Sequence, residues 1–253
     1  NWSQPAVHWV AVAAMILGSL PFALYVSTLR GHYRALLRDQ QVQGFLSILL
    51  LTWLALGTWY CLTSELHWLE AVRHVAINST SIMTTSGFAV GDYTLWGGFA
   101  GMLFFYLGFI GGCSGSTAGG LKIFRFQVAY VLLKANLQQL VHPRAVIKQQ
   151  YNMHRLDEDI VRSILTFSFF FTITIAALAL ALTLCGLDWI TALSGAASAV
   201  SGVGPGMGPI IGPAGNYAPL PDIAKWLLTL GMLLGRLEIL TVLVLLMPSF
   251  WRH

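Results

Sequence analysis

Long stretches without a charged side chain constrain this sequence more than any other feature. Residues 1–29, 40–64, 93–121, 163–187 and 189–221 contain no Asp, Glu, Lys or Arg. Only 9% of the 253 residues are charged, whereas a typical soluble domain carries about 25%. A helix needs about 20 apolar residues to cross the hydrocarbon core of a bilayer, and most of these stretches are long enough. The sequence therefore predicts an all-α polytopic membrane protein and excludes a water-soluble enzyme.

The positions of the basic residues predict the topology. Arginines cluster in residues 30–38, and a second basic group occupies residues 122–162. The segments that alternate with these groups along the chain hold only Arg73 and Lys225 as basic residues. Because loops rich in Lys and Arg stay in the cytoplasm, residues 30–38 are expected inside and Asn1 outside, with the C-terminus cytoplasmic. The net charge of +4 follows from this asymmetry, so it does not indicate nucleic-acid binding.

Five spans satisfy these charges. They cover residues 8–29, 43–63, 95 to about 133, 162–185 and 223–250, and they run alternately inward and outward. Two outer segments, residues 69–91 and 188–219, are too apolar for exposed loops, yet each lies between an outward and an inward span. Each is therefore expected to dip into the membrane and return on the same side, as a re-entrant element enclosed by protein or by a water-filled cavity.

The two re-entrant elements share an internal order. Each begins with a short helix, over residues 69–83 and 189–200, and continues into a Gly-containing segment. We name these segments the first return loop (residues 84–91) and the second return loop (residues 201–219). The chain thus contains a tandem unit of span, short helix, return loop and span, in which Gly87 and Gly204 occupy corresponding places.

The return loops carry the groups that a dehydrated cation needs. Backbone carbonyl oxygens without helical partners are costly at membrane depth unless something satisfies them. Thr84, Thr85 and Ser86 add hydroxyl oxygens, Gly87 permits positive φ, and the negative end of the short helix favours a cation. This pattern predicts a carbonyl-lined selectivity filter. The simpler alternative is that Thr-Thr-Ser-Gly is only a helix C-cap.

The third span contains a segment that a continuous helix does not favour. Five of the ten residues 111–120 are glycine, and an unbroken helix over residues 95–140 would be about 69 Å long, more than twice the hydrocarbon thickness. We name residues 111–122 the Gly-rich segment and expect a non-helical gate below the filter. Close helix packing through Gly111, Gly115 and Gly119 is the alternative. A phosphate-binding loop is excluded, because Leu121 separates Gly120 from Lys122.

Two charged residues and one serine motif remain. Arg236 is a formal charge near the middle of the otherwise apolar last span, with Glu238 two residues further on. It is expected either in the pore, bracing the Gly-rich segment, or in a buried ion pair. Lys122 either flanks the gate or only marks the cytoplasmic boundary.

Residues 112–115 have the G-x-S-G form of intramembrane serine proteases, but no histidine is expected at the depth of Ser114, so no enzyme is predicted.

The motifs at residues 84–88, 111–122, 140–143, 204–206 and 233–239 together resemble the bacterial Trk/Ktr potassium uptake family, above all its TrkH-like pore subunits. In that family, four span–pore helix–span repeats surround one pore. The resemblance implies that residues 1–30 close a second repeat and residues 31–42 form a cytoplasmic loop. Residues 43–140 would then be the third repeat, residues 141–158 a cytoplasmic linker and residues 159–253 the fourth repeat.

The resemblance also implies a function and a set of site residues. The function is potassium uptake across the bacterial inner membrane, with K⁺ as the transported ion and no organic cofactor; a carrier of Na⁺ or ammonium is the alternative, and a membrane scaffold without transport is a second. The implied partners are a second copy of the chain in a homodimer and a TrkA-like cytoplasmic nucleotide-binding subunit. The site residues are the filter residues Thr84, Thr85, Ser86, Gly87, Gly202, Val203 and Gly204; the gating-loop residues Gly111, Gly112, Ser114, Gly115, Ser116, Thr117, Gly119 and Gly120; the pore arginine Arg236; and Lys122 beside the gate.

Two departures from the family pattern matter. Ser201 and Gly202 stand where the fourth repeat of this subfamily commonly carries asparagine, so a side-chain contribution to ion binding is not expected there. Two filter strands also cannot surround an ion as four do. The remaining strands are expected from missing N-terminal repeats or a companion chain, and one copy of this chain is not expected to conduct.

Overall fold

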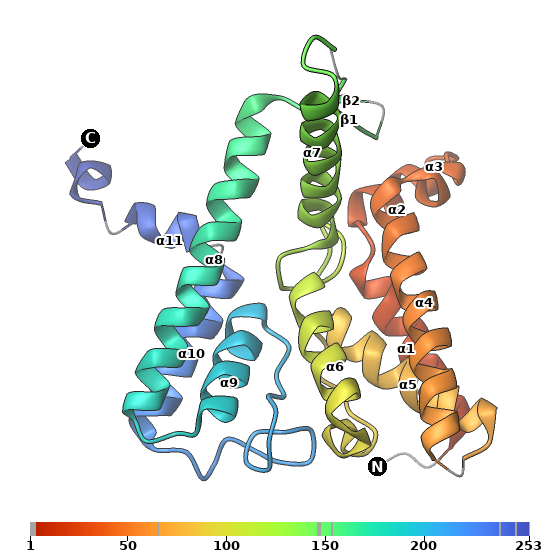
Figure 1. Cartoon of the computed structure of the whole chain (residues 1–253), viewed down its shortest axis with the longest axis vertical. Helices are drawn as coiled ribbons and strands as arrows, with labels where there is room; N and C mark the ends of the chain where they lie inside the picture. The colour runs from red at the N-terminus through yellow and green to blue at the C-terminus, as the bar shows by residue number, and fades with distance from the viewer. Residues whose placement is uncertain are drawn as a thin grey trace.

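The computed structural model describes residues 4–64, 66–145, 148–152, 154–237, 239–245 and 247–252 (Figure 1). The N-terminal part holds α1 (Pro5–Ser19), α2 (Phe22–Leu29) and α3 (Arg34–Arg38). Then follow α4 (Gln40–Thr63), α5 (Trp68–Met83), η1 (Tyr93–Trp96), α6 (Gly98–Ile110) and α7 (Ile123–Val141). An antiparallel hairpin of β1 (Gln150–Tyr151) and β2 (His154–Arg155) precedes α8 (Glu158–Leu184), α9 (Trp189–Ser201), α10 (Asp222–Arg236), α11 (Ile239–Leu245) and η2 (Pro248–Arg252).

The predicted all-α architecture with a tandem repeat is confirmed. Figure 1 shows α8, α9 and α10 on one side of the molecule and α1, α4 and α5 on the other, with α6 next to both short helices α5 and α9. Long helix, short helix and returning helix recur in the same order in the two halves: α4, α5 and α6 with α7, then α8, α9 and α10. The α4 and α8 helices are each long and apolar enough to cross a membrane.

The first and last predicted spans are not continuous helices. The α1 and α2 helices meet at 92°, because Pro21 immediately precedes α2, lacks a backbone N–H and forces Leu20 into an extended conformation. The predicted span over residues 223–250 breaks after Arg236, where α10 ends. Arg236 therefore lies at the negative end of a helix dipole, a favourable place for a cation, and not in the middle of a span.

The predicted interruption of the third span is confirmed, because α6 ends at Ile110 and α7 begins only at Ile123. The two short helices end where the sequence predicts, α5 at Met83 and α9 at Ser201. Small residues on α9, among them Ala192, Ala196 and Ala199, are fully or almost fully buried, which lets α8 and α10 approach it closely. Each half thus packs its long helices around a short one whose C-terminal end points into the molecule.

Candidate functional site

The first return loop leaves α5 through a tight C-terminal turn. The Ser86 amide donates to the carbonyl oxygen of Ser81 at 2.8 Å, and the Thr84 amide donates to that of Thr80 at 2.8 Å. Thr85 has φ 56° and Gly87 has φ 77°. A threonine in the left-handed region is strained, since its branched Cβ crowds the backbone there. The turn is therefore maintained by its surroundings and not by the preference of Thr85.

The second return loop repeats this backbone geometry. The Val203 amide donates to the Ser198 carbonyl at 3.0 Å, which is the bond that corresponds to Ser86 and Ser81. Gly202 has φ 72° and Gly204 has φ 110°, at the places of Thr85 and Gly87. Both loops thus contain the C-cap of the simpler alternative, with the 6→1 bond of a Schellman motif. A C-cap alone does not account for two such loops meeting inside the molecule.

The two return loops lie directly against each other. A methyl group added to Gly87 would lie 2.6 Å from the carbonyl oxygen of Val203 and 3.6 Å from Cδ of Pro205. The corresponding position on Gly204 would lie 3.8 Å from Cα of Gly87. Only a glycine at position 87 permits this approach, so the structure brings the predicted filter residues Gly87, Val203 and Gly204 together.

Polar side chains that the sequence reasoning missed hold the loops in place. The fully buried Asn78 of α5 accepts from the Val90 amide at 2.9 Å and donates to the Val90 carbonyl at 3.1 Å. In the second half, Ser198 Oγ accepts from the Gly204 amide at 3.0 Å, and the Tyr217 hydroxyl donates to the Gly204 carbonyl. The sequence could have indicated this contact, because an asparagine in a helix that is expected to be buried needs a hydrogen-bond partner.

The Gly-rich segment is a closed loop and not a helix. Its ends are joined by backbone bonds from the Leu121 amide to the Phe109 carbonyl at 3.2 Å and from the Ile123 amide to the Gly112 carbonyl at 3.1 Å. Gly111 has φ 68°, and a methyl group there would collide with the carbonyl oxygen of Gly119. The alternative of helix packing through glycines at four-residue spacing is therefore wrong.

This segment lies against both return loops. The Gly119 amide donates to Oγ1 of Thr85 at 2.8 Å, so this hydroxyl faces the Gly-rich segment. A methyl group on Gly119 would collide with the carbonyl oxygen of Ser201. The segment thus contacts the ends of both short helices at one residue.

The corner between α1 and α2 supports the same segment from another side. The Cys113 amide donates to the Ser19 carbonyl at 3.0 Å, and the Phe22 amide donates to the Gly115 carbonyl at 3.1 Å. Oγ1 of Thr117 donates to the Gly18 carbonyl at 2.9 Å. The bend that breaks the first predicted span is therefore also what exposes backbone groups to the Gly-rich segment.

Arg236 lies beside the Gly-rich segment, as the sequence predicts. Its Nη1 donates to the carbonyl oxygen of Thr117 at 2.9 Å, and Arg236 is exposed in this chain. Glu238, the acidic residue of the same motif, lies outside the described residues. Lys122 precedes α7 with φ 67° and lines a polar cavity with Gly119, Arg125 and Arg236.

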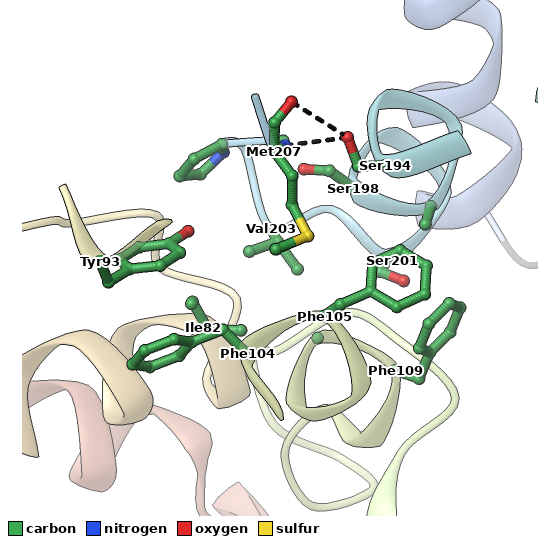
Figure 2. A pocket seen from close by; sticks show the side chains of 14 residues that line it. Ile82, Tyr93, Phe104, Phe105, Phe109, Ser194, Ser198, Ser201, Val203 and Met207 are labelled. Carbon is green, nitrogen blue, oxygen red and sulfur yellow. Dashed lines mark hydrogen bonds between the residues drawn. The ribbon is translucent and has the colours of Figure 1, made fainter. Parts of the chain in front are cut away.

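A second cavity lies between the two halves and is lined in part by the second return loop, including the predicted filter residue Val203. Figure 2 shows Phe104, Phe105 and Phe109 of α6 on one side and Ser194, Ser198 and Met207 on the other. Ser194 Oγ accepts from the Met207 amide at 2.9 Å. The lining is mostly aromatic and aliphatic, so this cavity lacks the ring of oxygen atoms that a dehydrated cation needs.

These features define a membrane protein with paired re-entrant loops above an intramembrane segment. A family model described as TrkH, cation transport protein, matches residues 2–252, and the chain belongs to this family. Membership of a transport family sets the serine-protease alternative aside. Within the described residues, no group of three or more His, Cys, Asp or Glu is placed to hold a metal ion.

Individual relatives agree with this assignment. The chain is 57% identical over 250 residues to the Trk system potassium uptake protein TrkI of Halomonas elongata, covering 99% of this chain and 51% of that protein. It is 31% identical over 254 residues to the Trk system potassium uptake protein TrkH of Vibrio parahaemolyticus, covering 98% and 51%. The crystal structure of the potassium transporter TrkH from Vibrio parahaemolyticus matches with a TM-score of 0.92 and 29% identity, covering all of this chain and 54% of that one. The chain thus spans about half the length of the curated relatives it matches.

Proposed function

We propose that this chain forms one half of a potassium-translocating pore in the bacterial inner membrane. K⁺ enters from outside, loses water among the oxygen atoms of the two return loops, and passes the Gly-rich segment toward the cytoplasm. No bond is made or broken. The filter residues are Thr84, Thr85, Ser86, Gly87, Gly202, Val203 and Gly204, with Asn1 outside and the C-terminus cytoplasmic.

The contact between the two return loops is the observation that carries this proposal. A Cβ on Gly87 would lie 2.6 Å from the Val203 carbonyl oxygen, so the backbones of the two loops meet at one place. The short helices α5 and α9 both end there, and the negative ends of their dipoles favour a cation over an anion. The relatives named above are potassium uptake proteins, which selects K⁺ among the monovalent cations.

The Gly-rich segment is the proposed gate, with Gly111, Gly112, Ser114, Gly115, Ser116, Thr117, Gly119 and Gly120 as its gating residues. Its Gly119 contacts Thr85 and Ser201, at the beginnings of the two return loops. The Arg236 guanidinium donates to the Thr117 carbonyl of the same segment. A positive charge at this place lowers cation occupancy when the segment is closed. Lys122 flanks the gate.

Further strands and partners complete the pore. Two return loops supply half of the oxygen atoms that surround an ion, so the other strands come from N-terminal repeats or a companion chain. From the resemblance, the assembly is a homodimer controlled by a TrkA-like cytoplasmic nucleotide-binding subunit.

Rubidium uptake into proteoliposomes tests the function. The chain is reconstituted with and without a companion segment that carries the first two repeats, and uptake is expected only with the companion. K⁺ is expected to compete with rubidium for uptake, whereas Na⁺ and ammonium are not. Competition by Na⁺ or ammonium would favour the alternative carrier, and no uptake with the companion would favour a membrane scaffold.

Shortening the Gly-rich segment tests the gate. Deletion of residues 114–117 is expected to raise rubidium uptake, because the segment no longer fills the space beneath the return loops. A fall in uptake in a folded protein would show that the segment supports the pore and does not close it.

A further inference from the structure

The start of α4 joins the Gly-rich segment to the cytoplasmic hairpin, and neither connection was expected from the sequence. The side-chain carbonyl of Gln41, in the first turn of α4, accepts from the Ser114 amide at 2.8 Å. These residues are far apart in the sequence. Ser114 is a proposed gating residue, and within the described residues its amide is bonded to Gln41 alone.

The preceding residues bind the tip of the hairpin. The Gln40 amide donates to Oδ1 of Asn152 at 3.0 Å, and the Asn152 amide donates to Oε1 of Gln40 at 3.2 Å. Nδ2 of Asn152 donates to Oδ2 of Asp39 at 2.9 Å. This reciprocal pair resembles a capping box, except that the capping residue comes from a distant part of the chain.

Asp39 connects the two contacts. Its Oδ1 accepts from the amides of Gln41 at 2.9 Å and Val42 at 3.3 Å, while its Oδ2 is bonded to Asn152. The first free N–H groups of α4 are therefore satisfied partly by its own N-cap and partly by the hairpin. Moving the hairpin removes bonds from the turn that positions the Gln41 side chain.

The hairpin is held firmly enough to act on α4. Asn152 has φ 48°, which asparagine tolerates better than most residues. The Tyr151 hydroxyl donates to Gln127 of α7, whose Nε2 donates to the Gln40 carbonyl at 2.7 Å. Burial, and after it the Asp39 carboxylate, raises the pKa of Tyr151, so this donor keeps its proton at physiological pH.

We propose that Gln41 is a positioning residue for the gate, and that Asp39, Gln40 and Asn152 couple it to the conformation of the cytoplasmic hairpin. This inference rests on the proposed function. The hairpin and the gate are then both bonded to the first turn of α4. A cytoplasmic event that displaces Asn152 loosens the bond between Gln41 and Ser114 and favours opening.

Hydrogen–deuterium exchange tests the coupling without any transport measurement. Asn152→Gly removes the side-chain bonds to α4 and suits the positive φ. It is expected to speed exchange in peptides that cover residues 111–122 by about fivefold, the factor for one neutral hydrogen bond. Gln43→Ala is the matched control, because Gln43 lies on the same turn but donates to the Leu37 carbonyl. Unchanged exchange in Asn152→Gly, or equal acceleration in the control, would overturn the coupling.

Rubidium uptake by the complete assembly then tests the positioning role. Gln41→Ala is expected to raise uptake about fivefold, and Gln41→Glu, which keeps an acceptor oxygen, to stay near the parent value. The double variant Gln41→Ala/Asn152→Gly is expected to resemble Gln41→Ala alone, because coupled residues do not add. Additive effects, or no effect of Gln41→Ala in an assembly that transports, would refute the inference. An assembly with no uptake in any form would refute the proposed function instead.

Discussion

The two return loops reach the same backbone geometry with different supports. In the first, one buried asparagine, Asn78, holds both polar groups of Val90. In the second, two side chains share this role: the Ser198 hydroxyl accepts from the Gly204 amide, and the Tyr217 hydroxyl donates to the Gly204 carbonyl. Thr85 in the first loop takes the left-handed conformation that Gly202 takes in the second. The repeat therefore conserves the path of the backbone, while the residues that enforce this path differ.

The largest expected effect is that of Gly87→Ala. The left-handed conformation costs a non-glycine residue about 1–2 kcal/mol, and the new methyl group would lie 2.6 Å from the Val203 carbonyl. Discrimination of K⁺ over Na⁺ is expected to fall at least about tenfold, as measured by competition in rubidium uptake. Gly204→Ala is the matched variant: its φ of 110° also strains an alanine, but the expected effect is smaller because its methyl group meets only ordinary contacts. Unchanged selectivity in both variants would count against the filter.

The supports of the two loops are expected to differ in strength. Asn78→Ala leaves two backbone groups of the half-buried Val90 without their partner and is expected to cost about 2–3 kcal/mol of stability. Ser198→Ala removes one bond and is expected to cost about 1 kcal/mol. Thermal unfolding in detergent measures both. Equal losses would show that the first loop does not depend on a single side chain.

Tyr217→Phe separates the support of the second loop from its packing. The substitution removes only the hydroxyl that donates to the Gly204 carbonyl, at a cost of about 1 kcal/mol. Selectivity for K⁺ is expected to weaken, and the unfolding temperature is expected to fall by about 2–4 °C. If the unfolding temperature falls and selectivity stays constant, Tyr217 serves the fold alone.

The smallest expected effect lies at the starts of the two short helices. The Asp188 side chain caps α9 by accepting from the Thr191 amide, whereas His67 at the start of α5 makes no side-chain cap bond. Asp188→Ala is expected to cost about 1 kcal/mol and His67→Ala much less. Both are measured by thermal unfolding.

The pH dependence of this cap has a definite sign. Hydrogen bonds with Thr191 lower the pKa of Asp188, so its contribution is present above the pKa of the unfolded chain and is lost as pH falls through the lower folded pKa. The stability difference between the parent and Asp188→Ala is therefore expected to shrink below pH 3.8. A difference that grows in acid would contradict the cap.

The sequence predicted the helical elements well where composition alone decides them. The long apolar runs of α4 and α8, the ends of both short helices and the interruption after Ile110 all follow from hydropathy, length and glycine content. The bend at Pro21 and the end of α10 at Arg236 were missed, since apolar residues continue on both sides of each break. A local rule about proline, applied strictly, would have found the first of them.

By itself, the sequence determined the class of the protein, its repeat and the residues that line the return loops, because these depend on local composition and on spacing along the chain. Only the tertiary structure decided which groups meet. The approach of Gly87 to Val203, the contact of Gly119 with both loops, and the link from Asn152 through Asp39 to Gln41 join residues that are distant in the sequence. Hydrogen bonds of this kind depend on distances of a few ångströms between separate elements, and no periodicity along the chain encodes them.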